Sequence, residues 1–294
     1  MKIAVTGGTG FVGRNLVNRL LSEGYSVTVT THKSPATGLI EGNISYAEAS
    51  VGDVDNLRRA FDGALVVYHL VGIIAETKRK TFQMTVVEGT KNVVEACRKS
   101  GVKKIIYLSA MGTSADASTV YHQTKYLAEQ AVVSSGLEYV IFRPSVIYGP
   151  GDGFVSLLTK MIKASPITPV IGDGRYMLQP VYIDDVVSAM VGALTVRSAS
   201  GRTIELGGPE KLEYLEILNI IRRVLNKRQV NLHIPLWVMK PAAFIMEKIV
   251  KPAPVTRDQL AMMQMGNTGD IAPMIELFSL SPVKLEDGLR KYLR

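Results

Sequence analysis

The stretch Thr6-Gly7-Gly8-Thr9-Gly10-Phe11-Val12-Gly13 follows an apolar, β-branched run at residues 2–6. Its glycines fit two overlapping patterns, Gly8-x-Gly10-x-x-Gly13 and Gly7-x-x-Gly10-x-x-Gly13. Glycine permits a tight turn, lets backbone N–H groups approach a pyrophosphate, and lets the following helix pack close to the strand. The start of that helix then offers free N–H groups to phosphates. The stretch therefore predicts a dinucleotide-binding turn, with a plain strand–helix turn as the alternative.

Outward from this turn, short β-type runs alternate with helical stretches that end at a glycine. Strands are expected at residues 2–6, 26–30, 44–47, 65–70, 103–108, 138–142 and 203–206. Helices are expected at residues 11–23, 81–100, 121–135, 212–225 and within 235–265. Such alternation predicts an α/β fold with a doubly wound parallel Rossmann sheet. We expect this domain at residues 1–165 and a smaller, mainly helical C-terminal lobe at 166–294, with 176–210 returning to the Rossmann part.

Composition narrows the class of protein further. The chain has 294 residues, of which 47% are apolar and 20% charged, so a large packed core is expected and a disordered chain is not. Cys97 is the single cysteine, and the four histidines show no metal-ligand spacing, so we expect neither a disulfide nor a metal site. The N-terminus lacks a cleavable signal pattern and no apolar run is long enough to span a membrane, which indicates a cytoplasmic location.

The end of the second strand bears on which dinucleotide is bound. NAD-specific sites usually place Asp or Glu there, whereas this chain has His32 and Lys33 and no acid. Together with Arg14, these cations could meet a 2′-phosphate, so NADP is favoured and NAD remains possible. Asp53 and Val54 follow the third strand, where Asp53 either bonds the adenine amino group or caps a helix.

Tyr121 and Lys125 lie four residues apart on one face of the helix after the fifth strand. This position puts them at the carboxyl edge of the sheet, beside the nucleotide crevice. A nearby cation lowers the pKa of a tyrosine, so the phenol can exchange a proton with a substrate hydroxyl or carbonyl. The pair therefore predicts acid/base chemistry.

Further motifs accompany these residues. They are Gly52-Asp53, His69-Leu70-Val71-Gly72, Glu88-Gly89-Thr90-Lys91-Asn92-Val93, Tyr107-Leu108-Ser109-Ala110-Met111-Gly112, and the run from Arg143-Pro144 to Gly153-Phe154. With them the chain resembles the short-chain dehydrogenase/reductase superfamily, in its extended and atypical, epimerase/dehydratase-like branches. Gln179-Pro180-Val181-Tyr182-Ile183-Asp184-Asp185-Val186 and Glu205-Leu206-Gly207-Gly208-Pro209 are similar to the branch of the NADPH-binding accessory subunit of mitochondrial complex I and its bacterial relatives.

The resemblance implies roles for individual positions. Tyr121 and Lys125 match the catalytic pair, and either Ser109 or Ala110 stands at the position of the catalytic hydroxyl. Val86 or Val87 stands where many relatives have Asn. The implied cofactor-binding residues are Gly7, Thr9, Gly10, Phe11, Val12, Gly13, Arg14, His32, Lys33, Asp53, Val54, Leu70, Val71, Gly72, Ser109, Tyr121, Lys125, Pro144, Ser145, Val146 and Ile147.

Excess positive charge gathers in one part of the chain. The net charge is +8, and residues 211–257 hold nine Lys or Arg against three Glu, or +6. Apolar runs interleave with these charges at residues 234–239, 242–246 and 249–250. We favour a core-facing helix with a solvated basic rim. The alternative is contact of segment 234–257 with a membrane surface or a protein complex, whereas nucleic acid is not expected because so apolar a helix leaves little polar surface for phosphates.

The hypothesis that follows is an NADP-dependent oxidoreductase, or an epimerase/dehydratase, acting on a small apolar, lipid-like or quinone-like carbonyl or alcohol. A first alternative is a non-catalytic NADPH-binding scaffold or redox sensor, because the hydroxyl position is Ser109 or Ala110. A second is a nucleotide-sugar epimerase. The second is disfavoured because Leu157, Leu158, Met161, Ile162, Ile167, Val170 and Ile171 indicate an apolar cleft.

Overall fold

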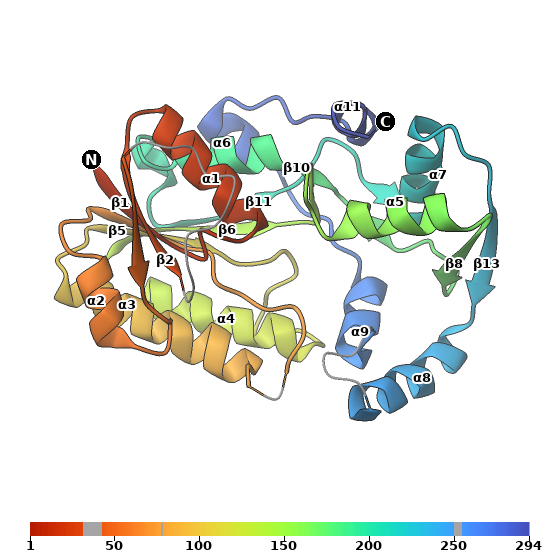
Figure 1. Ribbon diagram of the computed structural model, residues 1–294, viewed down its shortest axis with the longest axis horizontal. Helices are drawn as coiled ribbons and strands as arrows, with labels where there is room; N and C mark the ends of the chain where they lie inside the picture. Colours follow the sequence, from red (N-terminus) through yellow and green to blue (C-terminus); the bar gives the residue numbers. More distant parts are fainter. Residues whose placement is uncertain (32–42, 78, 250–254, 294) are drawn as a thin grey trace.

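A single seven-stranded sheet forms the centre of the larger lobe in a computed structural model that describes residues 1–31, 43–77, 79–249 and 255–293 (Figure 1). All of its strand pairs are parallel. The spatial order is β11 (Arg202–Leu206), β6 (Glu138–Pro144), β5 (Lys104–Leu108), β4 (Val66–His69), β1 (Lys2–Thr6), β2 (Ser26–Thr31) and β3 (Ile44–Glu48). The expected doubly wound Rossmann sheet is confirmed, with the order reversing between β1 and β4.

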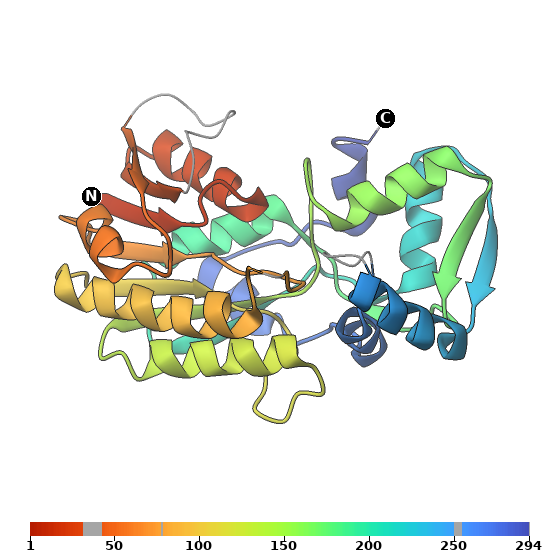
Figure 2. The same cartoon turned by 60° about the horizontal axis from the view of Figure 1, so that its bottom comes forward.

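Helices cover both faces of this sheet, as Figures 1 and 2 show from two sides. Ile3 and Val5 of β1 belong to a buried cluster with α1 (Phe11–Ser22), α6 (Ile183–Gly192) and α10 (Ala272–Phe278). Ala4 points to the opposite cluster, formed with α2 (Val54–Ala60), α3 (Gly89–Lys99) and α4 (Val120–Val133). Because both faces are covered, the central strands β1, β4 and β5 are apolar at most positions, which is why the sequence signal for them is strong.

The smaller lobe is built mainly from helices. Its elements are α5 (Phe154–Ala164), β8 (Ile167–Ile171), α7 (Tyr214–Val224), β13 (Val230–Ile234), α8 (Leu236–Ile249), α9 (Arg257–Met265) and α11 (Leu285–Arg290), with β8 and β13 as a parallel pair. Two further short strand pairs are present. They are β7 (Ile147–Tyr148) with β10 (Val181–Tyr182), which is parallel, and β9 (Met177–Leu178) with β12 (Leu212–Glu213), which is antiparallel. The helical C-terminal lobe is confirmed, while its boundary at residue 165 stays a prediction.

The exposure of α8 corrects one expectation. The basic, apolar segment was expected to turn its apolar side chains toward the core, yet Ala243 is the one residue of α8 that is buried. Trp237 and Ile249 are 77% and 75% exposed. These side chains are exposed because α8 extends from the small lobe and contacts chiefly α9.

A buried ion pair fixes α4 against the sheet. The guanidinium group of Arg143 on β6 donates two hydrogen bonds to the carboxylate of Glu129 on α4, at 2.9 and 2.5 Å. The side chain of Glu129 is 3% exposed, and that of Arg143 is 23% exposed. The hydrogen bonds to Glu129, together with its charge, raise the pKa of Arg143. Since α4 also carries Tyr121 and Lys125, the orientation of these two residues depends on this contact.

We expect Glu129→Ala to lower the free energy of unfolding by about 3 kcal/mol, because it leaves a partly buried cation without its partner. Urea denaturation followed by circular dichroism measures the change. Glu95→Ala is the matched control: Glu95 pairs with Lys99 on α3 at 2.7 Å, but both side chains are about half exposed, so its loss should cost less than about 0.5 kcal/mol. Equal changes in the two variants would contradict the structural role of Glu129.

Candidate functional site

The glycine turn packs directly against the end of β4. Gly7 has a φ of +76°, and a Cβ there would lie 3.0 Å from the carbonyl carbon of Leu70. A Cβ on Gly13 would overlap the carbonyl oxygen of Gly7. Gly10 begins α1 without a side-chain cap, so the start of the helix keeps N–H groups open to a ligand. The turn therefore has the shape that a pyrophosphate requires.

Beside this turn lies a cavity of about 420 Å³. It is lined by Gly7, Thr9, Gly10, Thr30, Thr31, Ala49, Ser50, Val51, Gly52, Leu70, Val71, Gly72, Ile73, Arg79, Lys80, Met84 and Thr85. These residues come from the carboxyl ends of β1 to β4, which is where open α/β sheets bind their ligands. The residues that line the cavity thus fit a dinucleotide, and this cavity is called the cofactor cavity below.

Six of the expected cofactor residues line the cofactor cavity: Gly7, Thr9, Gly10, Leu70, Val71 and Gly72. Phe11 and Val12 are partly buried and pack against the core beside it. Arg14 instead reaches toward Gly151, where a Cβ would lie 3.9 Å from Nη2. His32 and Lys33 lie outside the described residues.

Other expected cofactor residues have structural partners in this fold. The carboxylate of Asp53 accepts a hydrogen bond from the N–H of Asn56 at 3.0 Å, so it caps α2, and Val54 begins that helix. Pro144 ends β6, Ser145 donates its hydroxyl to the carbonyl oxygen of Asn267 at 2.9 Å, and Val146 and Ile147 continue toward β7. Binding roles for these six residues stay predictions.

Two cations in the cofactor cavity were not expected from the sequence. Arg79 and Lys80 line it from the loop after β4. The hydroxyl of Thr77 accepts hydrogen bonds from both of their backbone N–H groups, at 3.4 and 3.1 Å, and so shapes the turn that carries them. The basic run Lys78-Arg79-Lys80 was the available signal in the sequence.

Lys125 is buried next to the cofactor cavity. Its ammonium group donates to the carbonyl oxygen of Leu108 at 2.8 Å and lies 4.9 Å from the centre of the Tyr107 ring. A Cβ on Gly72 would lie 3.3 Å from Lys125 Nζ, so this cation sits behind the lining of the cavity. Burial lowers the pKa of Lys125 to about 8, and the charge of Glu129 opposes that shift.

Tyr121 lies one turn earlier on α4 and is 8% exposed. Its ring meets the edges of Phe82 and His122, with centroid distances of 5.8 and 5.0 Å. Burial raises the pKa of Tyr121 to about 12, which corrects the expectation that the nearby cation lowers it. The reason is that Lys125 Nζ is directed at the carbonyl of Leu108 and the ring of Tyr107. At neutral pH the phenol is therefore protonated and can act as a proton donor.

Ser109 and Ala110 both remain candidates for the position of the catalytic hydroxyl next to Tyr121 and Lys125. Ser109 is buried, and its Oγ lies 3.5 Å from Oγ1 of Thr113. Ala110 belongs to the same buried cluster as Tyr121 and Phe82. His69 is structural, because its ring contacts the hydroxyls of Thr6 and Thr90 at 2.7 and 3.0 Å and burial lowers its pKa to about 3. Ser109 therefore stays a predicted catalytic residue.

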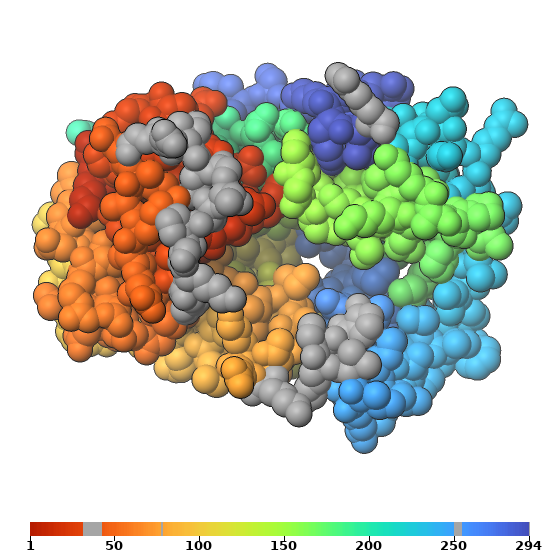
Figure 3. Space-filling model, in the orientation of Figure 1, coloured from red at the N-terminus to blue at the C-terminus, as the bar shows by residue number. Residues whose placement is uncertain are grey.

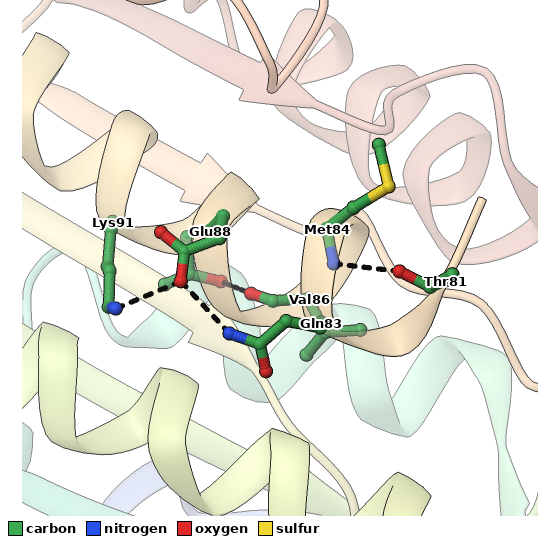
Figure 4. Close-up of polar contacts among 7 residues, drawn as sticks. Thr81, Gln83, Met84, Val86, Glu88 and Lys91 are labelled. Atoms are coloured by element: carbon green, nitrogen blue, oxygen red, sulfur yellow. Dashed lines mark hydrogen bonds and ion pairs between the residues drawn. The ribbon is translucent and has the colours of Figure 1, made fainter. Parts of the chain in front are cut away.

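A π-helix, η1 (Gln83–Glu88), precedes α3, where the sequence predicted an uninterrupted α-helix (Figure 4). The carboxylate of Glu88 accepts from Gln83 and Lys91, each at 3.0 Å, and Thr90 donates its hydroxyl to the carbonyl oxygen of Val86 at 2.6 Å. Such turns are rare and are frequent at functional sites. Here Val86 and Val87 are buried, so neither position brings a polar group to the site.

A second cavity of about 520 Å³ lies near Tyr121, between the lobes. Figure 3 shows the molecule hollowed in this region. Its lining residues are Ala75, Glu76, Phe82, Ser118, Val120, Glu247, Thr256, Arg257, Asp258 and Ala261. None of the apolar residues between 157 and 171 is among them; Leu158, Ile162 and Val170 are instead buried in the main core. We call this space the inter-lobe cavity.

Asp258 joins the small lobe to the helix that carries Tyr121 and Lys125. Its carboxylate accepts hydrogen bonds from the backbone N–H groups of Val120, at 3.1 Å, and Tyr121, at 3.3 Å. Thr119 accepts from the N–H of His122, so the first turn of α4 has three of its N–H groups satisfied. A contact across 137 residues leaves no local pattern, and Asp258 was not expected from the sequence.

Comparison with known proteins agrees with this architecture. The model of the NAD dependent epimerase/dehydratase family matches residues 3–207. The 3beta-hydroxysteroid-dehydrogenase/decarboxylase isoform 2 of Arabidopsis thaliana is 27% identical over 98% of this chain and 60% of its own length. The mitochondrial NADH dehydrogenase (ubiquinone) 1 alpha subcomplex subunit 9 of Arabidopsis thaliana is 29% identical over 85% of the chain and 65% of its own length. The chain thus spans less than two thirds of either relative.

Among solved structures, UDP-glucuronic acid 4-epimerase from Bacillus cereus, in complex with UDP-glucuronic acid and NAD, superposes with a TM-score of 0.75. It is 23% identical, and the match covers 98% of this chain and 96% of that one. At this identity the likeness concerns the fold. Together with the family match, it agrees with the resemblance inferred from the motifs.

Replacing Lys125 by Met should stabilise the protein at pH 7. The pKa of Lys125 is about 8 when folded, below its ordinary value of 10.5, so at pH 7 the folded state contains a buried charge that the unfolded chain keeps in water. Between pH 8 and 10.5 the unfolded state binds more protons, so the stability of the wild type rises with pH. The gain from Lys125→Met should therefore be largest below pH 8 and shrink toward pH 10.5.

Thermal unfolding at a series of pH values measures this difference between variant and wild type. Lys91→Met, at an exposed position on α3, is the control and should show no such trend. A gain in Tm that does not change with pH would contradict the burial of a charged Lys125.

Proposed function

Because the chain belongs to the NAD dependent epimerase/dehydratase family, we propose that it is an NADP(H)-dependent oxidoreductase that acts on an apolar carbonyl or alcohol. The observation that carries the proposal is the position of Tyr121 and Lys125. Lys125 adjoins the lining of the cofactor cavity at Gly72, and Tyr121 contacts Phe82, which lines the inter-lobe cavity. A proton-transfer pair thus stands between the two spaces in which cofactor and substrate would lie.

The chemistry that a bound nicotinamide dinucleotide supplies is hydride transfer. The residues of this chain would donate and accept the proton that accompanies the hydride. The phenol of Tyr121, with its pKa at about 12, is protonated at neutral pH and donates its proton to the substrate oxygen during reduction. The transfer leaves a phenolate, one helical turn from Lys125 on α4. In the reverse direction, the same phenolate takes a proton from an alcohol.

The preference for NADP rests on the charges around the cofactor cavity. Arg79 and Lys80 line it together with Thr30 and Thr31 at the end of β2, where an NAD-specific site would place a carboxylate. A 2′-phosphate is favoured by such cations and disfavoured by an acid. Arg79 and Lys80 would add to the contribution that the sequence assigns to His32 and Lys33.

The electrostatics of the inter-lobe cavity favour an uncharged substrate. Its lining includes the carboxylates of Glu76, Glu247 and Asp258 and one guanidinium group, that of Arg257, which pairs with Glu247 at 2.9 Å. A sugar diphosphate needs surplus positive charge, so nucleotide-sugar epimerisation is the less supported alternative. The steroid named for one relative and the ubiquinone named for another agree with a lipid-like or quinone-like substrate.

A non-catalytic NADPH-binding scaffold or redox sensor is the second candidate. The observation that favours it is Ala110, which shares the buried cluster of Tyr121, while the hydroxyl of Ser109 lies next to Thr113. Without a hydroxyl to orient the substrate carbonyl, the catalytic set is incomplete. Tight retention of NADPH without its oxidation by a broad panel of carbonyl compounds would support this candidate, and steady oxidation would exclude it.

Replacing Tyr121 by Phe should abolish turnover and leave the affinity for NADPH nearly unchanged, because the change removes only the proton donor. NADPH oxidation with the carbonyl panel measures turnover, and fluorescence titration measures affinity. Tyr126→Phe, on the same helix, is the matched control and should keep its activity. Full turnover in the Tyr121 variant would exclude the assigned role.

Replacing both Arg79 and Lys80 by Ala should weaken NADPH binding about tenfold and leave NADH binding unchanged, because only NADPH carries the 2′-phosphate. Isothermal titration calorimetry measures both affinities. Arg58→Ala with Arg59→Ala, two adjacent exposed cations on α2, serves as the control pair. An equal loss for both nucleotides would contradict a role in recognising the 2′-phosphate.

A further inference from the structure

The outer side of α8 is an apolar surface that faces water. Trp237, Pro241, Ile245 and Ile249 follow one another at steps of four residues, so they form one row along the helix, and all four are exposed. Their neighbouring row, also at steps of four, is Lys240, Phe244 and Lys248, which are exposed as well. We call these seven residues the α8 outer face. A helix of a water-soluble lobe would ordinarily present polar residues on this side.

The charges of α8 lie on or beside its outer face. The outer face contains two lysines, and Lys248 Nζ lies 4.3 Å from the centre of the Phe244 ring. The single carboxylate of α8, that of Glu247, lies at the edge of the outer face, where it lines the inter-lobe cavity and is paired with Arg257 at 2.9 Å. The guanidinium group of Arg257 lies 4.9 Å from the centre of the Phe244 ring. The seven residues of the outer face themselves are apolar or cationic, and the one acid beside them is neutralised by an ion pair.

Further exposed apolar and basic residues precede α8. β13 leads into the helix, and its Val230 and Leu232 are 70% and 55% exposed. Lys227 and Arg228, just before β13, are exposed too. Figures 1 and 2 show that β13 lies at the end of the small lobe farthest from the large sheet, and that α8 runs from there back toward the large lobe.

We propose that the α8 outer face docks on the surface of an anionic lipid bilayer. An in-plane amphipathic helix buries apolar side chains at the level of the headgroups while lysines meet anionic lipid, and Trp is favoured at that depth. Residues 211–257 have a net charge of +6, which attracts an anionic surface and repels a second copy of this chain.

The length of α8 agrees with lying in the interface. Its 14 residues span about 21 Å, less than the roughly 30 Å of a hydrocarbon core. Among the residues with described structure, no helix is long and apolar enough to cross a membrane.

Docking would also bring the inter-lobe cavity to the lipid. α8 would touch the bilayer with its outer face, and Glu247 at the edge of that face lines the cavity. This part rests on the proposed function: an amphipathic substrate resident in the bilayer would reach Tyr121 without crossing water. The docking itself does not depend on turnover.

Flotation of the full-length protein with vesicles tests the docking. Vesicles of phosphatidylcholine with 30% phosphatidylglycerol should carry the protein upward, and vesicles of phosphatidylcholine alone should carry much less. Lys240→Glu with Lys248→Glu should weaken binding at least about tenfold, because two attractive charges become repulsive. Trp237→Ser with Ile249→Ser should do the same through lost apolar burial.

Matched controls distinguish an effect of the α8 outer face from a general effect of charge reversal or of misfolding. Lys91→Glu with Lys99→Glu reverses two half-exposed cations on α3 and should leave flotation unchanged. Unaltered NADPH binding and melting would show that the α8 variants are folded. Tyr121→Phe should float like the wild type, so that failure of the catalytic role and failure of docking are told apart.

Three results would overturn the proposal. They are a wild type that does not float with anionic vesicles, charge-reversed α8 variants that float as well as the wild type, and light scattering that shows a dimer dissociated by Trp237→Ser with Ile249→Ser. The last result would assign the α8 outer face to a second copy of this chain.

Discussion

The fold depends on how closely two backbones approach at the centre of the sheet. A Cβ on Gly7 would press against the backbone of Leu70, and one on Gly13 would overlap the carbonyl oxygen of Gly7. With glycine at both positions, β1 can turn within a few residues into α1, and β4 can end beside that turn. The crevice at this point of the sheet exists because no side chain fills it. The cofactor cavity, the loop that carries Arg79 and Lys80, and the approach of Lys125 to Gly72 are all arranged around it.

Burial determines the pKa values of Tyr121 and Lys125, the two candidate catalytic side chains on α4. It moves the pKa of Tyr121 up to about 12 and that of Lys125 down to about 8, so both shifts favour the uncharged form. The ion pair of Glu129 with Arg143 anchors the same helix, and the charge of Glu129 limits the shift at Lys125. The site therefore holds a protonated phenol beside an easily deprotonated amine. This arrangement stabilises neither group as an ion and leaves both able to respond when charge develops on a substrate oxygen.

Much of this architecture follows from local patterns in the sequence. Strands buried on both faces appear as apolar runs in the sequence. The weaker run at residues 44–47 was also predicted as a strand, and it is β3 (Ile44–Glu48), a partly exposed strand at the edge of the sheet. Other features were not predicted, each for its own reason. Asp258 reaches α4 across 137 residues, the π-helix at Gln83–Glu88 resembles an α-helix in its pattern, and the exposure of α8 depends on where the small lobe places it. Residue patterns reveal apolar faces, but they do not reveal what covers them.

Although the chain as a whole has a net charge of +8, two of its surfaces differ in the sign of their charge. The inter-lobe cavity is lined by three carboxylates and one guanidinium group, whereas the α8 outer face has two lysines and no acid. Glu247 and Lys248 are adjacent in the chain, yet one lines the cavity and the other faces outward. An anion attracted to the outer face is therefore disfavoured in the cavity behind it. A substrate that enters from an anionic membrane surface would therefore need an uncharged reacting end. A membrane-resident ketone, alcohol or quinone has such an end.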